Sequence, residues 1–145
     1  MYQHILIPTD GSPLSEQAVR QAITLAQATK ARVTALTVSA PFRTFATDPV
    51  MVTDTPQEYE KDCAARAEGY LCFVRDAAAR AGVPYDGVHV IAEHPYAAII
   101  ETATQRGCDL ICMASHGRKG LSALLLGSET VKVLTHTKIT TLVCR

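Results

Sequence analysis

Short apolar runs alternate along the chain with longer segments in which apolar residues recur every three or four positions. The first pattern predicts strands, and the second predicts half-buried helices. Residues 5–9 are mostly apolar and lead into residues 10–13, where glycine permits a sharp turn, Ser12 can cap a helix and Pro13 suits its first position. A strand, a turn and a helix are therefore predicted in succession.

The same alternation continues to the last residues. The predicted strands lie at 5–9, 33–39, 88–92, 109–114 and 140–144. The predicted helices lie at 13–29, 57–81, 94–107 and 128–135. Residues 40–56 contain three prolines and show no sustained period, so they predict a long mobile loop that could act as a lid.

Strands that alternate with helices favour an open α/β sheet built from right-handed crossovers. Residues 109–114 form a nearly continuous apolar run, which is typical of a parallel strand covered by helices on both faces. Ligands of such sheets bind beyond the carboxyl ends of the strands, where the strand order reverses. Residues 9–11, 38–39 and 114–117 end the first, second and fourth predicted strands, so function is expected there.

The chain has 145 residues and a mass of 15.6 kDa, which suits one domain spanning residues 1–145. Hydrophobic residues make up 48% and charged residues 19%, which excludes disorder for the bulk of the chain. Lys and Arg number 14, as do Asp and Glu, so no positive surplus exists for nucleic-acid phosphates or an anionic membrane. Neither nucleic acid nor membrane is expected as a partner.

The first residues have no basic start, long apolar stretch or cleavage site of the kind found in signal peptides. No window approaches the roughly 18 apolar residues of a membrane span, so a soluble, cytoplasmic protein is expected. The five cysteines lack paired Cys-x2-Cys spacing and are interpreted as packed, reduced thiols. The five histidines are scattered, so no metal site built from protein side chains is predicted.

A glycine turn and a helix start suggest an anion site. Gly117 follows the fourth predicted strand, and after nine residues Gly127-Ser128 begins the next predicted helix. This arrangement offers backbone N–H groups, a positive helix end and a hydroxyl to a phosphate. Arg118 and Lys119 add charge that could neutralise a polyphosphate or remain solvated. From these residues alone, phosphate binding and an ordinary glycine-rich connection are equally favoured.

Catalytic patterns are weaker. Ser115 and His116 beside Asp10 suggest a hydrolase triad, but neighbouring side chains of an extended segment point in opposite directions. By its turn alone, Asp10 is read as a helix-capping carboxylate rather than a ligand contact. The chain lacks the Gly-x4-Gly-Lys-Ser/Thr loop and a Gly-x-Gly-x-x-Gly after the first strand. No residue is found to drive phosphoryl transfer, so hydrolysis is expected to be slow at most.

Taken together, these segments resemble the universal stress protein family along nearly the whole chain. Residues 5–12 resemble the first strand and turn of the family, and residues 109–117 resemble its fourth strand. The nucleotide-binding branch carries Gly, two residues, Gly, nine residues, then Gly with Ser or Thr. The later positions match at Gly117 and 127–128, whereas Ala114 replaces the first glycine. That alanine permits close approach of the backbone to a ribose if its φ is negative.

The resemblance implies a Rossmann-like fold similar to the adenine nucleotide alpha hydrolases, with an open five-stranded parallel sheet in the order 3-2-1-4-5 and helices on both faces. It implies ATP as ligand, with Mg²⁺ or Mn²⁺ carried by the phosphates. Asp10 would contact the ribose, the Val38 main chain would hold the adenine edge, and the glycine motif would bind the phosphates. The complete set of implied nucleotide-binding residues is Pro8, Thr9, Asp10, Val38, Met113, Ala114, His116, Gly117, Gly127, Ser128 and Glu129.

The resemblance further implies a non-enzymatic stress-response module of regulatory or protective role. It also implies a homodimer that pairs through residues 140–144, because an exposed edge strand is usually covered or paired. Two alternatives remain open. A homodimeric interaction module without nucleotide is favoured by Ala114 and disfavoured by the retained Gly117 and 127–128. A nucleotide-cleaving or nucleotidyl-transfer enzyme would need catalytic residues that the sequence does not reveal.

Overall fold

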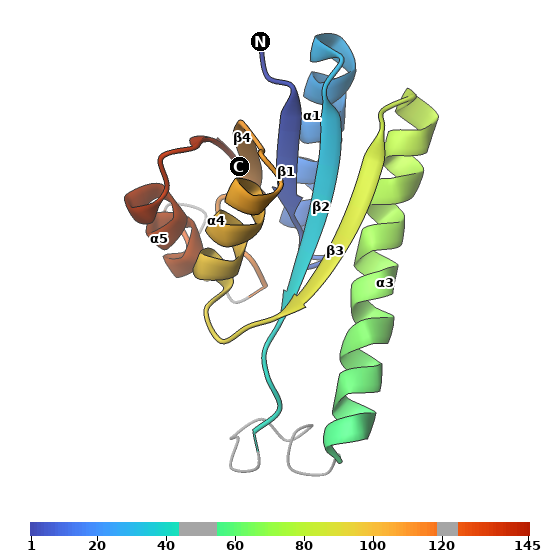
Figure 1. Ribbon diagram of the computed structural model, residues 1–145, viewed down its shortest axis with the longest axis vertical. Helices are drawn as coiled ribbons and strands as arrows, with labels where there is room; N and C mark the ends of the chain where they lie inside the picture. The colour runs from blue at the N-terminus through green and yellow to red at the C-terminus, as the bar shows by residue number, and fades with distance from the viewer. Residues whose placement is uncertain (44–54, 119–124) are drawn as a thin grey trace.

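The computed structural model describes residues 1–43, 55–118 and 125–145, and strands and helices alternate through these ranges (Figure 1). The strands are β1 (His4–Pro8), β2 (Arg32–Ser39), β3 (Tyr85–Ile91), β4 (Leu110–Ala114) and β5 (Thr140–Cys144). The helices are α1 (Pro13–Thr29), α3 (Pro56–Ala81), α4 (Pro95–Gln105) and α5 (Ser128–His136). Residues 44–54 of the predicted lid lie outside the described residues.

All five strands pair in parallel in one sheet, in the order β3-β2-β1-β4-β5. The predicted fold class and strand order are thereby confirmed. The chain builds outward from β1 to β3 and then crosses to β4 on the other side of β1 (Figure 1). The strand order therefore reverses at β1 and β4, and their carboxyl ends flank the switch point where ligands of open α/β sheets bind.

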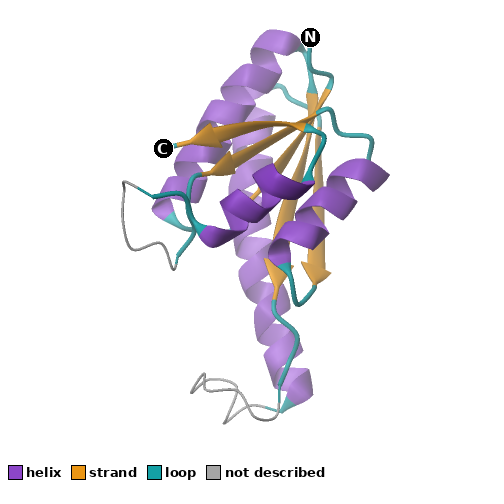
Figure 2. Ribbon diagram, turned by 90° about the vertical axis from the view of Figure 1, so that its left-hand side faces the viewer, coloured by secondary structure: helices purple, strands orange, loops and turns teal. Residues whose placement is uncertain are grey.

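Helices cover both faces of the sheet, α1 and α3 on one and α4 and α5 on the other (Figure 2). Successive side chains of a strand point to opposite faces. Ile5 and Ile7 of β1 consequently pack in the core beneath α1 and α3, whereas Leu6 packs with Ile99 of α4 and Val133 of α5. All three β1 side chains are fully buried, which explains the apolar run that predicted this strand.

Local signals set the helix ends. The Ser12 hydroxyl accepts a hydrogen bond from the Ser15 N–H at 3.2 Å and caps α1 as predicted. Thr55 and Glu58 form a reciprocal capping box at the start of α3. Residue 56, assigned to the predicted loop, is in fact the first residue of this helix. A cap with proline after it explains the earlier start.

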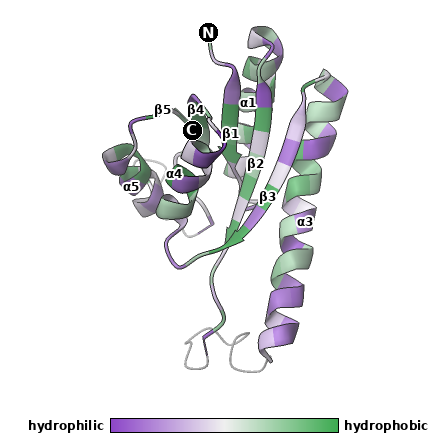
Figure 3. Ribbon diagram, viewed as in Figure 1, coloured by the Kyte–Doolittle hydropathy of each residue, from purple (hydrophilic) through white to green (hydrophobic). Residues whose placement is uncertain are grey.

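The third strand begins earlier than predicted. It runs from Tyr85 rather than residue 88, and its first residues pair with Val33 to Ala35 of β2. Asp86 and Gly87 are exposed, so this end of an edge strand has no apolar run to reveal it. The hydropathy colouring shows the contrast between the hydrophobic β1 and the paler, partly hydrophilic β3 (Figure 3).

All five cysteines are free thiols, and four of them are buried. The Sγ atoms of Cys112 and Cys144 lie 3.7 Å apart inside the core beneath α1. Burial raises the pKa of the Cys108 thiol to about 11 and also raises that of Cys112. The four buried thiols pack as small hydrophobic groups, as predicted, whereas Cys72 is only half-buried. Among the described helices, none is long and apolar enough to cross a bilayer.

Candidate functional site

The turns that follow β1 and β4 are joined at the switch point. Asp10 is half-buried, and its Oδ2 accepts a hydrogen bond from the Arg118 N–H at 2.9 Å. Its Oδ1 accepts one from the Ser12 N–H at 3.0 Å. A Cβ on Gly117 would lie 2.5 Å from Asp10 Oδ2, so a side chain there would displace the Asp10 carboxylate. The structure thus brings Asp10 and Gly117 together.

Thr9 is buried and holds the first turn in place. Its N–H donates to the Leu36 carbonyl at 2.8 Å, and its hydroxyl accepts from the Ser15 hydroxyl at 2.7 Å. The Thr37 hydroxyl donates to the Thr9 carbonyl at 3.1 Å. Pro8, the preceding residue, pairs with Leu36 and ends β1. Thr9 is therefore occupied with supporting the turn, and Asp10 presents the polar group.

Val38 lies on β2 beyond the end of β1. The Leu36 carbonyl accepts from Thr9, on the β1 side, whereas the Ser39 carbonyl accepts from Ala92 at 3.0 Å, on the β3 side. Main-chain groups of successive residues in a strand point to opposite edges. Those of Val38 therefore point to the same edge as those of Leu36, where β1 has already ended. One donor and one acceptor face the switch point.

The N-terminus of α5 lies beside the turn after β4. Gly127 is its N-cap and supplies no side-chain hydrogen bond, and its N–H donates to the Ser115 carbonyl at 2.7 Å. A Cβ at Gly127 would lie 3.0 Å from the Cα of His116, so the two segments are in close contact. Ser128, the first helical residue, is exposed. An uncapped helix start with a hydroxyl and free N–H groups can bind an anion.

Ala114 occupies the position where the nucleotide-binding pattern has glycine. Its φ is negative, because Lys30 is the one described non-glycine residue with a positive φ. The condition for close approach of a ribose is therefore met. The Thr130 hydroxyl donates to the Ala114 carbonyl at 3.1 Å and ties α5 to β4. Met113 is buried in the core under α4 and α5, so its side chain is directed away from the switch point.

The Glu129 side chain turns away from the switch point. Its Oε2 accepts the Tyr96 N–H at 2.8 Å, and its Oε1 lies 3.2 Å from the Lys132 Nζ. Tyr96 lies in the first turn of α4, whose N-cap residue, His94, makes no capping side-chain bond. Glu129 therefore caps a neighbouring helix, and only its main chain remains for a ligand.

Ser115 and His116 differ from the geometry expected of them. The Ser115 hydroxyl and His116 Nδ1 lie 3.1 Å apart and share a hydrogen bond, because the chain bends after β4 instead of staying extended. The two side chains therefore do meet, contrary to the prediction that they point in opposite directions. The two oxygens of Asp10 accept main-chain N–H groups, and Ser115 is only 4% exposed. The three residues do not line up as nucleophile, base and orienting acid.

Tyr70 of α3 also lies at the candidate site, although no sequence pattern predicted it there. Its ring covers Gly11, whose φ is +73° and whose added Cβ would lie 2.2 Å from Tyr70 Cε1. The guanidinium carbon of Arg118 lies 4.9 Å from the ring centroid, and Arg118 Nη2 donates to the Tyr70 hydroxyl. A half-buried tyrosine within a helical pattern carries no signal for such contacts.

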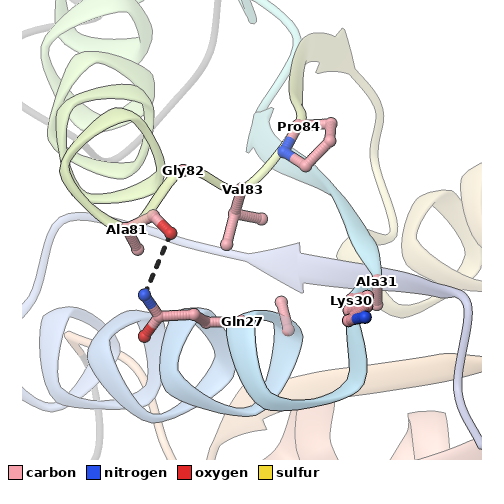
Figure 4. Close-up of a pocket in the computed structure, with 8 residues that line it drawn as sticks. Gln27, Lys30, Ala31, Ala81, Gly82, Val83 and Pro84 are labelled. Atoms are coloured by element: carbon pink, nitrogen blue, oxygen red, sulfur yellow. Dashed lines mark hydrogen bonds between the residues drawn. The ribbon is translucent and has the colours of Figure 1, made fainter.

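A cleft of about 270 Å³ lies between the C-terminal ends of α1 and α3 and is lined by Gln27, Lys30 and Val83 among others (Figure 4). It sits at the amino ends of β2 and β3, where ligands of this fold class do not bind. Among the described residues, no group of three or more His, Cys, Asp or Glu could hold a metal ion.

Comparison with known proteins identifies the family. The family model of the Universal stress protein family matches residues 1–145. The chain belongs to the universal stress protein family. A universal stress protein of Methanocaldococcus jannaschii, MJ0531, is 30% identical over 139 residues, which cover 92% of this chain and 76% of the relative. The solved structure of protein MJ0577 is 26% identical, with a TM-score of 0.83 and coverage of 99% and 96% of the two chains.

Two similar structures were solved with nucleotides. A universal stress protein in complex with cAMP is 24% identical, with a TM-score of 0.69 and coverage of 98% of this chain and 95% of its own. One from Archaeoglobus fulgidus in complex with dAMP is 16% identical, with a TM-score of 0.70 and coverage of 99% and 98%. At these identities the likeness shows a shared fold.

Proposed function

We propose that this universal stress protein binds an adenine nucleotide at the carboxyl edge of its sheet, with ATP and Mg²⁺ or Mn²⁺ as the physiological combination. The observation that carries the proposal is the uncapped start of α5 at Gly127, which lies against the turn joined to Asp10. Such a helix start favours phosphate through its N–H groups and its positive dipole end. The cAMP and dAMP complexes of two structural neighbours support adenine as the base.

Each part of the nucleotide has a candidate partner. The Val38 main chain offers one donor and one acceptor, which suits the hydrogen-bonding edge of adenine. The Asp10 carboxylate can accept a ribose hydroxyl in addition to its two N–H donors. Main-chain groups of Gly117 and 127–129, with the Ser128 hydroxyl, would hold the phosphates. The metal would then be bound by phosphate oxygens and water.

The proposed role is regulatory or protective and cytoplasmic, with at most slow ATP hydrolysis. Phosphoryl transfer needs a base and groups that stabilise the γ-phosphate, and the described residues around Asp10 supply no aligned set. The protein is proposed to act as a homodimer paired through β5. Leu142 of this edge strand is 40% exposed, which leaves apolar surface for a second copy to cover.

Calorimetric titration of the protein with ATP and with AMP, in the presence of Mg²⁺, tests the nucleotide proposal. Gly127→Asp should abolish binding, because the new carboxylate caps α5 itself and repels the phosphate. Gly127→Ala is the matched control: it adds the same Cβ, 3.0 Å from His116, without charge or capping group. It should retain binding with a reduced affinity.

Absence of ATP and AMP binding by the unmodified protein would refute the proposal and favour the interaction module. Equal loss of affinity in the aspartate and alanine variants would show that close packing at Gly127, rather than phosphate contact, is what matters there.

A further inference from the structure

Two arginines flank Tyr70 next to the proposed site. Arg118 extends from the turn after β4 and rests on the Tyr70 ring, with a hydrogen bond to its hydroxyl. Arg66 precedes Tyr70 by four residues on α3, and side chains at that spacing are neighbours on a helix surface. Arg66 also donates a hydrogen bond to the Cys63 Sγ at 3.5 Å. This bond is the main cause of a raised pKa for Arg66; burial opposes it, and the nearby Cys63, Tyr70 and Tyr59 groups add to the increase.

Arg66 and Arg118 are both exposed residues. Within the parts of the chain that the structure describes, no ion pair joins Arg66 or Arg118 to a carboxylate, whereas Arg43 and Arg106 each have one and Arg75 has two. The Arg118 main chain does bind Asp10, but through its N–H rather than its guanidinium. A guanidinium held by an aromatic ring is oriented in advance and can form two parallel hydrogen bonds to a phosphate.

The position of Arg66 and Arg118 suits those phosphates of a nucleotide that lie beyond its first phosphate. Arg118 follows Gly117 directly, and Tyr70 covers Gly11, so the arginine pair adjoins the turns after β1 and β4. α3 carries Arg66 and Tyr70 there because the helix extends past the carboxyl edge of the sheet (Figure 1). The dipole of α5 offers only roughly half an elementary charge. That partial charge can favour the binding of one phosphate, but each additional phosphate needs further positive charge.

We propose that Arg66 and Arg118, positioned by Tyr70, form an anion subsite for the distal phosphates of the bound nucleotide, so that the protein prefers nucleoside triphosphates to monophosphates. This inference rests on the proposed nucleotide function. Arg118 and Arg66 contact the phosphates, and Tyr70 is a positioning residue that acts through them.

The test compares the affinities for ATP and AMP by calorimetry at one salt concentration. The unmodified protein should bind ATP more tightly than AMP. Arg118→Gln and Arg66→Gln should each weaken ATP binding about tenfold, the loss of a charge-assisted hydrogen bond, and leave AMP binding within about twofold. Arg80→Gln, in the last turn of the same helix and far from the edge, is the matched control and should change neither affinity.

Tyr70→Phe keeps the ring and removes the hydroxyl that holds Arg118. It should lower the ratio of ATP to AMP affinity by a smaller factor than Arg118→Gln, whereas a merely structural role would change thermal stability and leave the ratio constant. AMP binding in each variant shows that the fold and the main site persist. An unchanged affinity ratio in both arginine variants, or equal weakening of ATP and AMP, would overturn the subsite. Failure of the unmodified protein to bind either nucleotide would instead overturn the proposed function.

Discussion

Replacing Gly11 by alanine probes how α3 locks the turn that carries Asp10. Gly11 has φ of +73°, in the left-handed region that glycine adopts readily. An alanine Cβ would lie 2.2, 2.3 and 2.9 Å from three atoms of the Tyr70 ring. Two carbon atoms that are not bonded cannot approach so closely, so the Tyr70 ring must move. The backbone is strained as well.

The free energy of unfolding should fall by about 3 kcal/mol, from two contributions. A left-handed conformation costs an L-residue about 1–2 kcal/mol. Displacing the Tyr70 ring loses its contact with the Arg118 guanidinium, about 0.5–1 kcal/mol at an exposed site, and part of its apolar burial, about 1 kcal/mol. Since the ring is displaced only by the new methyl group, the second contribution should vanish when the ring is absent.

Urea denaturation measures the free energy of unfolding of four proteins, which are the unmodified chain, Gly11→Ala, Tyr70→Ala and the double variant. The urea concentrations at the unfolding midpoints are compared, with the dependence of the unfolding free energy on urea concentration held constant. Without the tyrosine ring, Gly11→Ala should cost only the backbone contribution, about 1–2 kcal/mol. The difference between the two backgrounds is the coupling energy of the pair. Equal losses in both backgrounds would show that Tyr70 does not cover Gly11, and a loss below about 0.5 kcal/mol would refute the positive φ.

Three further predictions concern other parts of the molecule. Glu129→Ala should lower stability by about 1 kcal/mol, read as a fall in Tm, because α4 loses its cap at the Tyr96 N–H; an unchanged Tm would contradict this. Burial, and secondly the charge of Arg32, lowers the pKa of His4 in the folded protein. The unfolded chain therefore binds a proton at this histidine more readily, so the free energy of unfolding should be highest above about pH 6.5 and should decline as the pH falls below that value. His4→Gln should flatten that decline in Tm measured from pH 5 to 7.5; an equal decline in the variant would exclude His4 as its source. Leu142→Lys should give a monomer in sedimentation velocity, since a lysine on β5 opposes edge pairing; a persistent dimer would rule out this interface.

The sequence determined the elements whose signals lie within a few residues. The buried run of β1 and the Ser12 cap with Pro13 were both readable, because periodicity and capping are local properties. The sheet order and the family followed from motifs at the ends of β1 and β4. The start of β3 was not readable, since an exposed edge strand has no apolar pattern to maintain.

The tertiary structure decided which distant groups meet. Arg118 reaches Tyr70 on another layer, Glu129 caps a neighbouring helix, and Ser115 meets His116 only because the chain bends after β4. These contacts depend on how helices settle on the two faces of the sheet and on the direction in which each side chain emerges. The hydrophobic pattern specifies which face of a helix is buried. It does not specify the rotation and translation that place one polar side chain opposite another.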